Sequence, residues 1–192
     1  MTLVPIHPEA VPDDPDALRW VMPAGTLDFV GEPSALPAAL QELYAAGVLA
    51  HAVTVEPTAV LLRISPGRTW RADGGGVRRV LQTALAEPDA WGRPAGASAD
   101  DLVRAAVEEV LAGEVGDFVR GHGGAIEVLD VSDGRVTIEL GGACEGCPAS
   151  GLTVKTRFEA AVRRRCPELR EVVAREGAPR RGGLLRLLPT SR

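Results

Sequence analysis

The chain has 192 residues, of which 45% are apolar, and it carries a formal net charge of −5 at pH 7. This length and composition predict a globular protein with one large or two small domains, and the acidic balance argues against a surface for nucleic acid. No run of 18 apolar residues occurs, and residues 1–5 lack the basic and apolar regions of an export signal. We therefore expect a cytoplasmic protein without a membrane span.

The first part of the chain, residues 1–90, is expected to form a small α+β domain. Repeated prolines between residues 5 and 15 predict an extended arm, because proline fixes its own φ and disfavours helix in the residue before it. Further on, β-rich runs alternate with runs that have the apolar spacing of a helix. The elements expected there are a strand over 17–22, a helix over 36–46, a hairpin over 52–55 and 59–64, and a helix over 77–85.

Residues 91–100, rich in Pro, Gly and Ala, are the expected linker to a second small domain, residues 101–178. Either Asp100 or Asp101 could cap its first helix. The elements expected there are a helix from about 100 to 118, hairpin strands over 126–131 and 136–140, a helix from Pro148 to Cys166, and a short strand over 169–173. The basic segment 179–192 is expected to be a flexible tail. Both domains are therefore predicted to be short antiparallel sheets with helices packed on one face.

Two cysteines, Cys144 and Cys147, are separated by only two residues and follow the second strand of the predicted hairpin. A structural zinc site and an iron–sulfur cluster both need four ligands. The only other cysteine is Cys166, and no histidine lies close enough in sequence to complete a local set. The pair is therefore half a metal site, and if it binds metal the remaining ligands must come from another molecule.

The position of the pair also suits metal chemistry. Cys147 directly precedes the predicted helix, where unpaired N–H groups and the positive end of the helix dipole lower the pKa of a thiol. A thiol–disulfide oxidoreductase or a zinc-binding protein could use the same two cysteines, and both stay open as alternatives. Against redox use, the charge of Glu145 raises the pKa of neighbouring thiols, and an antiparallel hairpin rather than a βαβ unit precedes them.

Four stretches occur in order in the second half of the chain, namely GGAIE at 123–127, GACEGCPAS at 142–150, LTVK at 152–155 and PELREV at 167–172. Together they resemble the NifU C-terminal-like (Nfu-type) iron–sulfur scaffold domain, over about residues 101–175. Residues 14–20, the helix before Gly47, and Trp70 are similar, more loosely, to the N-terminal domain of the same family.

The resemblance implies that Cys144 and Cys147 of two protomers hold one bridging [4Fe–4S] cluster, so that the loaded protein would be a homodimer. It also implies a scaffold or carrier, not an enzyme, that works with upstream cluster assembly machinery and transfers the cluster to client apo-proteins. The first domain would then recognise clients or support the geometry of the dimer. No catalytic constellation can be argued from the spacing of the residues.

Three other residues have chemistry that the cysteine pair does not explain. His122 lies in a glycine-flanked turn where the family commonly has an acidic residue, and Cys166 is not a usual family position, so neither receives a ligand role. We expect His122 to be structural and Cys166 to be a small buried hydrophobic residue. Lys155, the only lysine, is expected to be a solvated surface cation, although it could offset the negative charge of a cluster or meet a client carboxylate.

Overall fold

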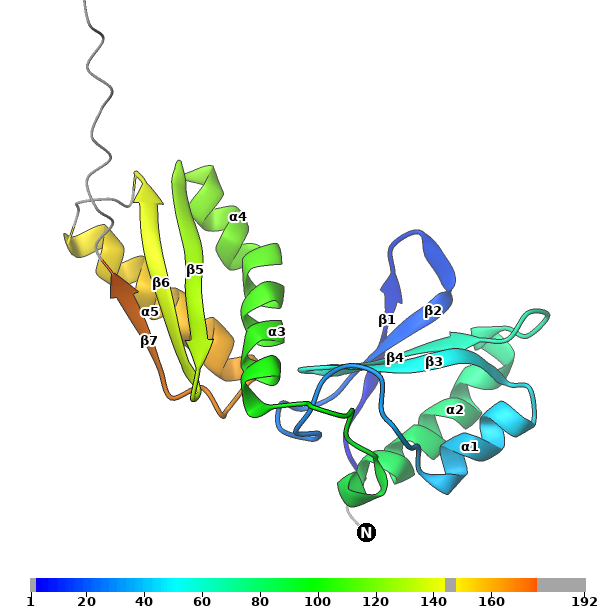
Figure 1. Cartoon of the computed structure of the whole chain (residues 1–192). Helices are drawn as coiled ribbons and strands as arrows, with labels where there is room; N and C mark the ends of the chain where they lie inside the picture. The colour runs from blue at the N-terminus through cyan, green and yellow to red at the C-terminus, as the bar shows by residue number, and fades with distance from the viewer. Residues whose placement is uncertain (1–2, 144–147, 176–192) are drawn as a thin grey trace, which may run out of the picture.

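The computed structural model describes residues 3–143 and 148–175 of the chain. Figure 1 shows two lobes, each built from a small sheet with helices against one face. The elements of the first lobe are β1 (His7–Val11), β2 (Asp14–Val21), α1 (Ala38–Ala45), β3 (Leu49–Glu56), β4 (Ala59–Ile64), α2 (Trp70–Leu85) and the 3-10 helix η1 (Pro88–Ala90). Those of the second are α3 (Ala99–Ala112), α4 (Glu114–Gly121), β5 (Gly124–Ser132), β6 (Arg135–Gly142), α5 (Pro148–Arg165) and β7 (Glu171–Arg175). The α+β class that the sequence predicts is confirmed.

The first sheet is antiparallel throughout, with the strand order β1-β2-β4-β3. One face of this sheet packs against α1 and α2 (Figure 1), which contribute Leu40 and Leu81 to the core. Trp20 is 2% exposed and meets Trp70 edge-on, with the ring centroids 6.0 Å apart. The first lobe therefore has a hydrophobic core of its own, centred on the tryptophan pair and the two helices.

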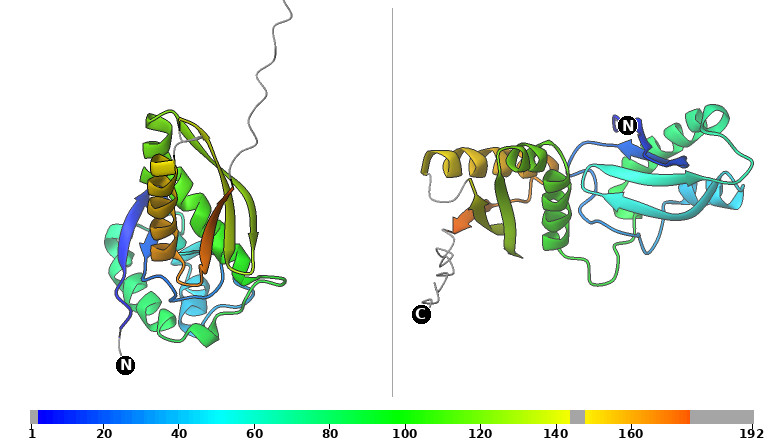
Figure 2. Two further views of the ribbon diagram at one scale, coloured as in Figure 1. Left: turned by 90° about the vertical axis from the view of Figure 1, so that its left-hand side faces the viewer. Right: turned by 90° about the horizontal axis from the view of Figure 1, so that it is seen from above.

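The second sheet has the strand order β5-β6-β7. β5 and β6 form the expected antiparallel hairpin, whereas β7 pairs with β6 in parallel. Because α5 carries the chain from the end of β6 back to the start of β7, the two strands run in the same direction. This third strand is the one difference from the expected antiparallel sheet. Figure 2 shows α3, α4 and α5 on the same face of the sheet, where Val107, Ile138 and Phe158 are buried.

Two elements of the first lobe differ from their predicted bounds. The expected arm between residues 5 and 15 contains β1, which pairs with β2 at the edge of the sheet, a position where proline is tolerated. The second helix begins at Trp70 rather than at residue 77, because the hydroxyl of Thr69 accepts a hydrogen bond from the N–H of Ala72 and caps the helix there. Hydrogen bonding therefore set these bounds, through the pairing with β2 for β1 and through the Thr69 cap for α2.

The single helix expected from about 100 to 118 is two helices. Gly113 has an extended backbone between α3 and α4 and so interrupts the helical hydrogen bonding. The N-cap of α3 is Ser98, not Asp100 or Asp101. Asp101 instead completes a capping box with Ser98, while the carboxylate of Asp100 accepts hydrogen bonds from the backbone of the β5–β6 turn.

The segment expected to be a linker, residues 91–100, starts with a core residue. Trp91 is 4% exposed and packs in the first core. Its indole N–H donates a hydrogen bond to the carbonyl oxygen of Ala84, with an N···O distance of 2.9 Å. The first core thus reaches one residue past position 90, and the exact division into domains stays a prediction.

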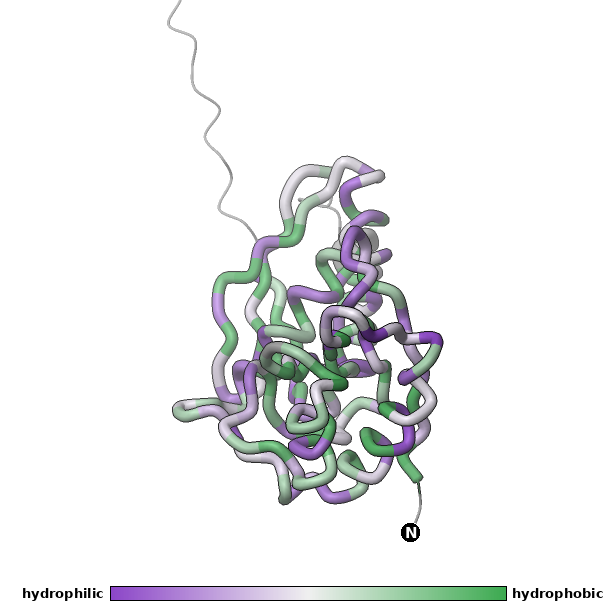
Figure 3. The backbone as a smooth tube through the Cα atoms, turned by 90° about the vertical axis from the view of Figure 1, so that its right-hand side faces the viewer, coloured by the Kyte–Doolittle hydropathy of each residue, from purple (hydrophilic) through white to green (hydrophobic). Residues whose placement is uncertain are grey.

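Apolar and hydrophilic residues are interspersed along the backbone of both lobes (Figure 3). The longest helix, α5, has 18 residues and ends in three arginines, Arg163, Arg164 and Arg165. None of the helices in the described part of the chain is long and apolar enough to cross a membrane.

Candidate functional site

The predicted site lies between β6 and α5. Cys144 and Cys147 are outside the described residues, but both flanks are described, since β6 ends at Gly142 and α5 begins at Pro148. Figures 1 and 2 show the end of β6, the start of β5 and the C-terminal end of α4 together at one end of the second lobe. In the chain, the cysteine pair therefore stands between a strand end and a helix start, and the first turn of a helix carries unpaired N–H groups.

The end of β6 has a backbone conformation that requires glycine. Gly142 has a φ of +64°, and a Cβ at this position would lie 2.3 Å from the carbonyl oxygen of Gly123. The N–H of Ala143 donates a hydrogen bond to that same oxygen, with an N···O distance of 2.9 Å. Gly123 has a φ of +71°, which side-chain-bearing residues rarely adopt. The backbone is thus fixed up to the residue directly before Cys144.

His122 ends α4 beside this contact. Its backbone N–H donates to the carbonyl oxygens of Phe118 and Val119, and its Nδ1 lies 2.8 Å from the carbonyl oxygen of Phe118. A carbonyl oxygen can only accept, so Nδ1 carries the proton in the neutral ring. The imidazole also packs on the Phe118 ring, with a centroid distance of 4.4 Å. These contacts support the structural role expected for His122.

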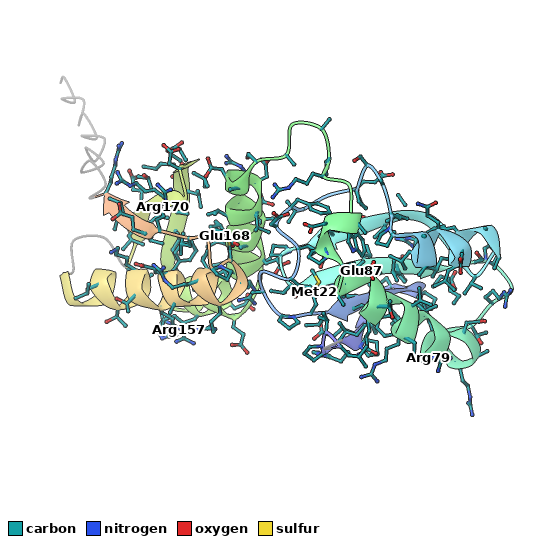
Figure 4. The ribbon with its side chains drawn as sticks, turned by 90° about the horizontal axis from the view of Figure 1, so that it is seen from below. Met22, Arg79, Glu87, Arg157, Glu168 and Arg170 are labelled. Carbon is teal, nitrogen blue, oxygen red and sulfur yellow. The ribbon has the colours of Figure 1, made fainter. Side chains whose placement is uncertain are left out.

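The middle of α5 is fixed to α4 by an arginine–aromatic contact. The guanidinium carbon of Arg157 (Figure 4) lies 4.3 Å from the centroid of the Phe118 ring, within the range of a cation–π interaction. Val154 and Phe158 are buried in the core, whereas Leu152 is 65% exposed. This part of α5 therefore has one buried side and one open side, and the open side presents a large apolar residue close in sequence to the cysteine pair.

Lys155 belongs to a partly exposed row of charges along α5. Its Nζ lies 3.7 Å from Oε2 of Glu159, and Oε1 of the same glutamate accepts a hydrogen bond from Arg163 at 2.7 Å. Pairs of this kind on a helix surface contribute about 0.3–0.5 kcal/mol to stability. The contacts agree with the expected surface cation.

Cys166 lies at the other end of α5 and is fully buried. Since the 18 residues of α5 rise 1.5 Å each, Cys166 is about 27 Å along the helix from Pro148. Burial raises the pKa of its thiol to about 12, and the neighbouring carboxylate of Glu168, 3.3 Å away, acts in the same direction. The expected buried hydrophobic role is confirmed. A metal–sulfur bond is about 2.3 Å long, so Cys166 cannot join the cysteine pair on one cluster.

Two of the three histidines lie in the first lobe, in a different sheet from the flanks of the cysteine pair. His7 lies on β1 and His51 on β3, both in the first sheet. Within residues 3–143 and 148–175, no group of three or more His, Cys, Asp and Glu side chains could hold a metal ion. Sequence reasoning missed the contact between Phe118 and Arg157, which links two helices that are far apart in sequence. The glycine pairs at 123–124 and 141–142 are the signal that could have revealed the turn contact beside the site.

A family model described as "NifU-like domain" matches residues 107–173, from the second half of α3 to β7. This match includes both Cys144 and Cys147. The second lobe therefore contains a NifU-like domain over residues 107–173. The matched region therefore contains the two turn glycines, the helix α5 and the parallel strand that follows it.

Several curated proteins named "Fe/S biogenesis protein NfuA" are similar to this chain. The protein from Edwardsiella ictaluri is 32% identical over 92 residues, and that from Pectobacterium atrosepticum is 33% identical over 92 residues, each match covering 47% of both chains. The protein from Acinetobacter baylyi is 33% identical over 79 residues, which are 38% of this chain and 37% of that protein. The chain thus spans about half the length, or less, of the curated relatives it matches.

Proposed function

We propose that Cys144 and Cys147 of two copies of this chain together bind one [4Fe–4S] cluster, and that the protein passes this cluster to client apo-proteins. The observation that carries the proposal is the position of Cys166, which is buried and about 27 Å from the start of α5. One chain therefore offers two sulfur donors where a cluster needs four, and a second copy supplies the other two.

The described surroundings of the pair support cluster binding. Gly142 and Ala143 are held against Gly123 by close packing and a hydrogen bond, so the strand end before Cys144 is rigid. After the pair, α5 is anchored by Val154, buried in the core. Rigid flanks reduce the entropy lost when two thiolates are brought to one cluster, and the free N–H groups at a helix start stabilise negative charge.

The exposed surface of α5 supports contact with a second copy. Leu152 is 65% exposed and stands five residues after Cys147. Burial of an exposed leucine in an interface is favourable by roughly 1.5–3 kcal/mol, and twofold symmetry would use the same residue on both chains. An interface centred there would bring two cysteine pairs towards one another.

The names of the relatives support a role in iron–sulfur biogenesis for this chain as well. We propose that it acts as a scaffold or carrier and not as an enzyme. In this proposal the cluster is cargo, received from upstream assembly machinery in the cytoplasm. The NifU-like domain, predicted as residues 101–178, holds the cargo. The preceding domain, predicted as residues 1–90, recognises clients or supports the dimer.

The test is anaerobic reconstitution of the full chain with iron and sulfide, followed by absorbance, iron analysis and native mass determination. The expected product is a brown dimer with about two irons per chain, that is, one four-iron cluster per two chains. Cys144→Ala with Cys147→Ala should abolish the colour, and the matched change Cys166→Ala should retain it. A loaded monomer, or colour that survives the double change, would overturn the proposal.

The same experiment separates the two alternatives. A zinc protein would be colourless and would lose its metal to a chelator, while a thiol–disulfide oxidoreductase would reduce a disulfide substrate catalytically as a colourless monomer. Transfer is measured by mixing the loaded dimer with an apo-protein that needs a [4Fe–4S] cluster. The client should gain activity faster than it does from free iron and sulfide.

A further inference from the structure

Among the described residues, no helix packs against one of the two faces of the second sheet. Figure 1 shows the sheet from this side, with α5 behind it, and Figure 2 shows the helices grouped on the other side. Since alternate residues of a strand point to opposite faces, the residues between the buried positions Val136, Ile138 and Leu140 of β6 point away from the core. We call this side, defined by Glu127, Leu129, Thr137, Glu139 and Val173, the open face, although Thr137, on the central strand, is only 7% exposed.

The centre of the open face is apolar. Leu129 is 42% exposed and packs in neither hydrophobic core. It lies in the irregular register between Val128 and Asp130 and has no register partner itself, while the next residue, Asp130, pairs with Thr137, which in turn pairs with Val173 of β7. An exposed leucine on the edge strand β5 is a candidate for contact with another apolar segment.

Two carboxylates lie next to this apolar centre. Glu127 and Glu139 are directly opposite one another on β5 and β6, an arrangement of like charges that is unfavourable in a sheet. Neither forms an ion pair with another residue in the described part of the chain. Arg175, the last described residue, is the register partner of Glu139 on β7. A basic segment following Arg175 would relieve the repulsion between the two glutamates.

We propose that the C-terminal segment 180–188 of this same chain binds the open face. This segment has the sequence RRGGLLRLL, and no acidic residue follows Glu176. Its arginines, Arg180 and Arg181, complement Glu127 and Glu139. Its leucines, at 184, 185, 187 and 188, complement the apolar centre around Leu129.

The length of the connection fits this contact. Only four residues separate Arg175 from Arg180, and five extended residues span up to about 17 Å. Adjacent strands are about 4.8 Å apart, so β5 lies about 10 Å across the sheet from β7. The arginines therefore reach both glutamates without any movement of β7.

The test is limited trypsin cleavage of the full chain, which does not require a bound cluster. Cleavage after Arg180, Arg181 and Arg186 is followed by intact mass and compared with that of a synthetic peptide of residues 176–192. Bound tail should be cleaved several-fold more slowly than the free peptide, because cleavage follows the fraction of unbound tail. Cleavage at the rate of the free peptide would overturn the proposal.

Variants locate the contact. Glu127→Gln with Glu139→Gln should raise the rate of tail cleavage towards that of the free peptide, by up to about fivefold for each surface charge pair lost, and Leu129→Ala should raise it in the same direction. The matched control is Leu3→Ala with Glu87→Gln, which removes an exposed leucine and an exposed carboxylate from the first lobe and should leave cleavage unchanged. If the tail is cleaved at the same rate in the open-face variants and in the control, the open face is not the binding surface.

Dilution distinguishes the two possible sources of the tail. Protection within one chain is independent of protein concentration, whereas protection by the tail of a second copy falls as the protein is diluted. Protection that disappears on dilution would overturn the assignment to the same chain. Circular dichroism of each variant confirms that the sheet is still folded.

Discussion

Gly142 and Gly123 are in such close contact that a Cβ on Gly142 would lie 2.3 Å from the carbonyl oxygen of Gly123. The same oxygen accepts the N–H of Ala143, so the contact joins the end of β6 to the turn after α4. The backbone position of Ala143, the residue before Cys144, is therefore fixed by two glycines that are 19 positions apart in sequence.

Gly142→Ala should destabilise the NifU-like domain by about 1–3 kcal/mol, because alanine is strained at a φ of +64° and collides with the opposite carbonyl. The measurement is urea unfolding of the metal-free chain. Gly141→Ala is the matched control, since a Cβ there has only an ordinary contact at 3.7 Å with Ala125. Equal unfolding midpoints for the two variants would contradict this account of the strand end.

The thiol of Cys166 should make stability depend on pH in the alkaline range. Burial raises its pKa from 9.0 to about 12, so above pH 9 the unfolded chain loses the thiol proton while the folded chain keeps it. The contribution of the thiol to the free energy of unfolding is therefore fully present below pH 9 and is lost as the pH rises towards 12. Urea midpoints at pH 8 and pH 10 should fall less in Cys166→Ala than in the unchanged chain. A fall of the same size in both would show that another group titrates.

Leu152→Glu should weaken the cluster-bound dimer without affecting the fold of one chain, because the side chain is 65% exposed and lies outside the core. Two glutamates facing one another across a twofold axis would repel. Native mass spectrometry of the reconstituted protein should therefore show a larger monomer fraction. Leu3→Glu is the control, since Leu3 is similarly exposed, at 59%, on the first lobe. Unchanged dimerisation in Leu152→Glu would move the interface elsewhere on the domain.

An ion network joins the two lobes through Arg19. Its Nη2 lies 2.6 Å from Oε2 of Glu56 in the first lobe and 3.7 Å from Oε1 of Glu109 on α3. Glu109 also accepts a hydrogen bond from Arg165 at 3.2 Å. Burial raises the pKa of Glu109, although both arginines oppose this effect. The lobes are thus connected by charges whose removal should free their relative motion.

Glu109→Gln should broaden the distance distribution measured by small-angle X-ray scattering, while the free energy of unfolding changes by no more than about 1 kcal/mol. The control is Glu171→Gln, which removes an ion pair with Arg135 that lies within the second sheet. A broader distribution in the control alone, or in neither variant, would contradict a role for Glu109 in joining the lobes.

Local signals predicted most of the fold. Alternating residues 136–140 predicted β6, the apolar spacing after Pro148 predicted α5, and both are present. Errors arose where a hydrogen bond outside the apolar pattern set an element's start, as Thr69 does for α2 and Ser98 for α3. The parallel pairing of β7 with β6 was also missed, because strand direction depends on the path of α5 and not on the residues of β7.

The sequence alone determined the donor count, because cysteines can be counted without coordinates and only two of three stand together. Only the tertiary structure decided that Cys166 is unavailable as a ligand of the same cluster, since its burial and its place at the far end of α5 depend on packing. Likewise, the contacts of Gly142 with Gly123 and of Arg19 with Glu109 join residues far apart in the chain. Residue types and short spacings specify local chemistry, whereas distances between remote segments are set by how the cores pack.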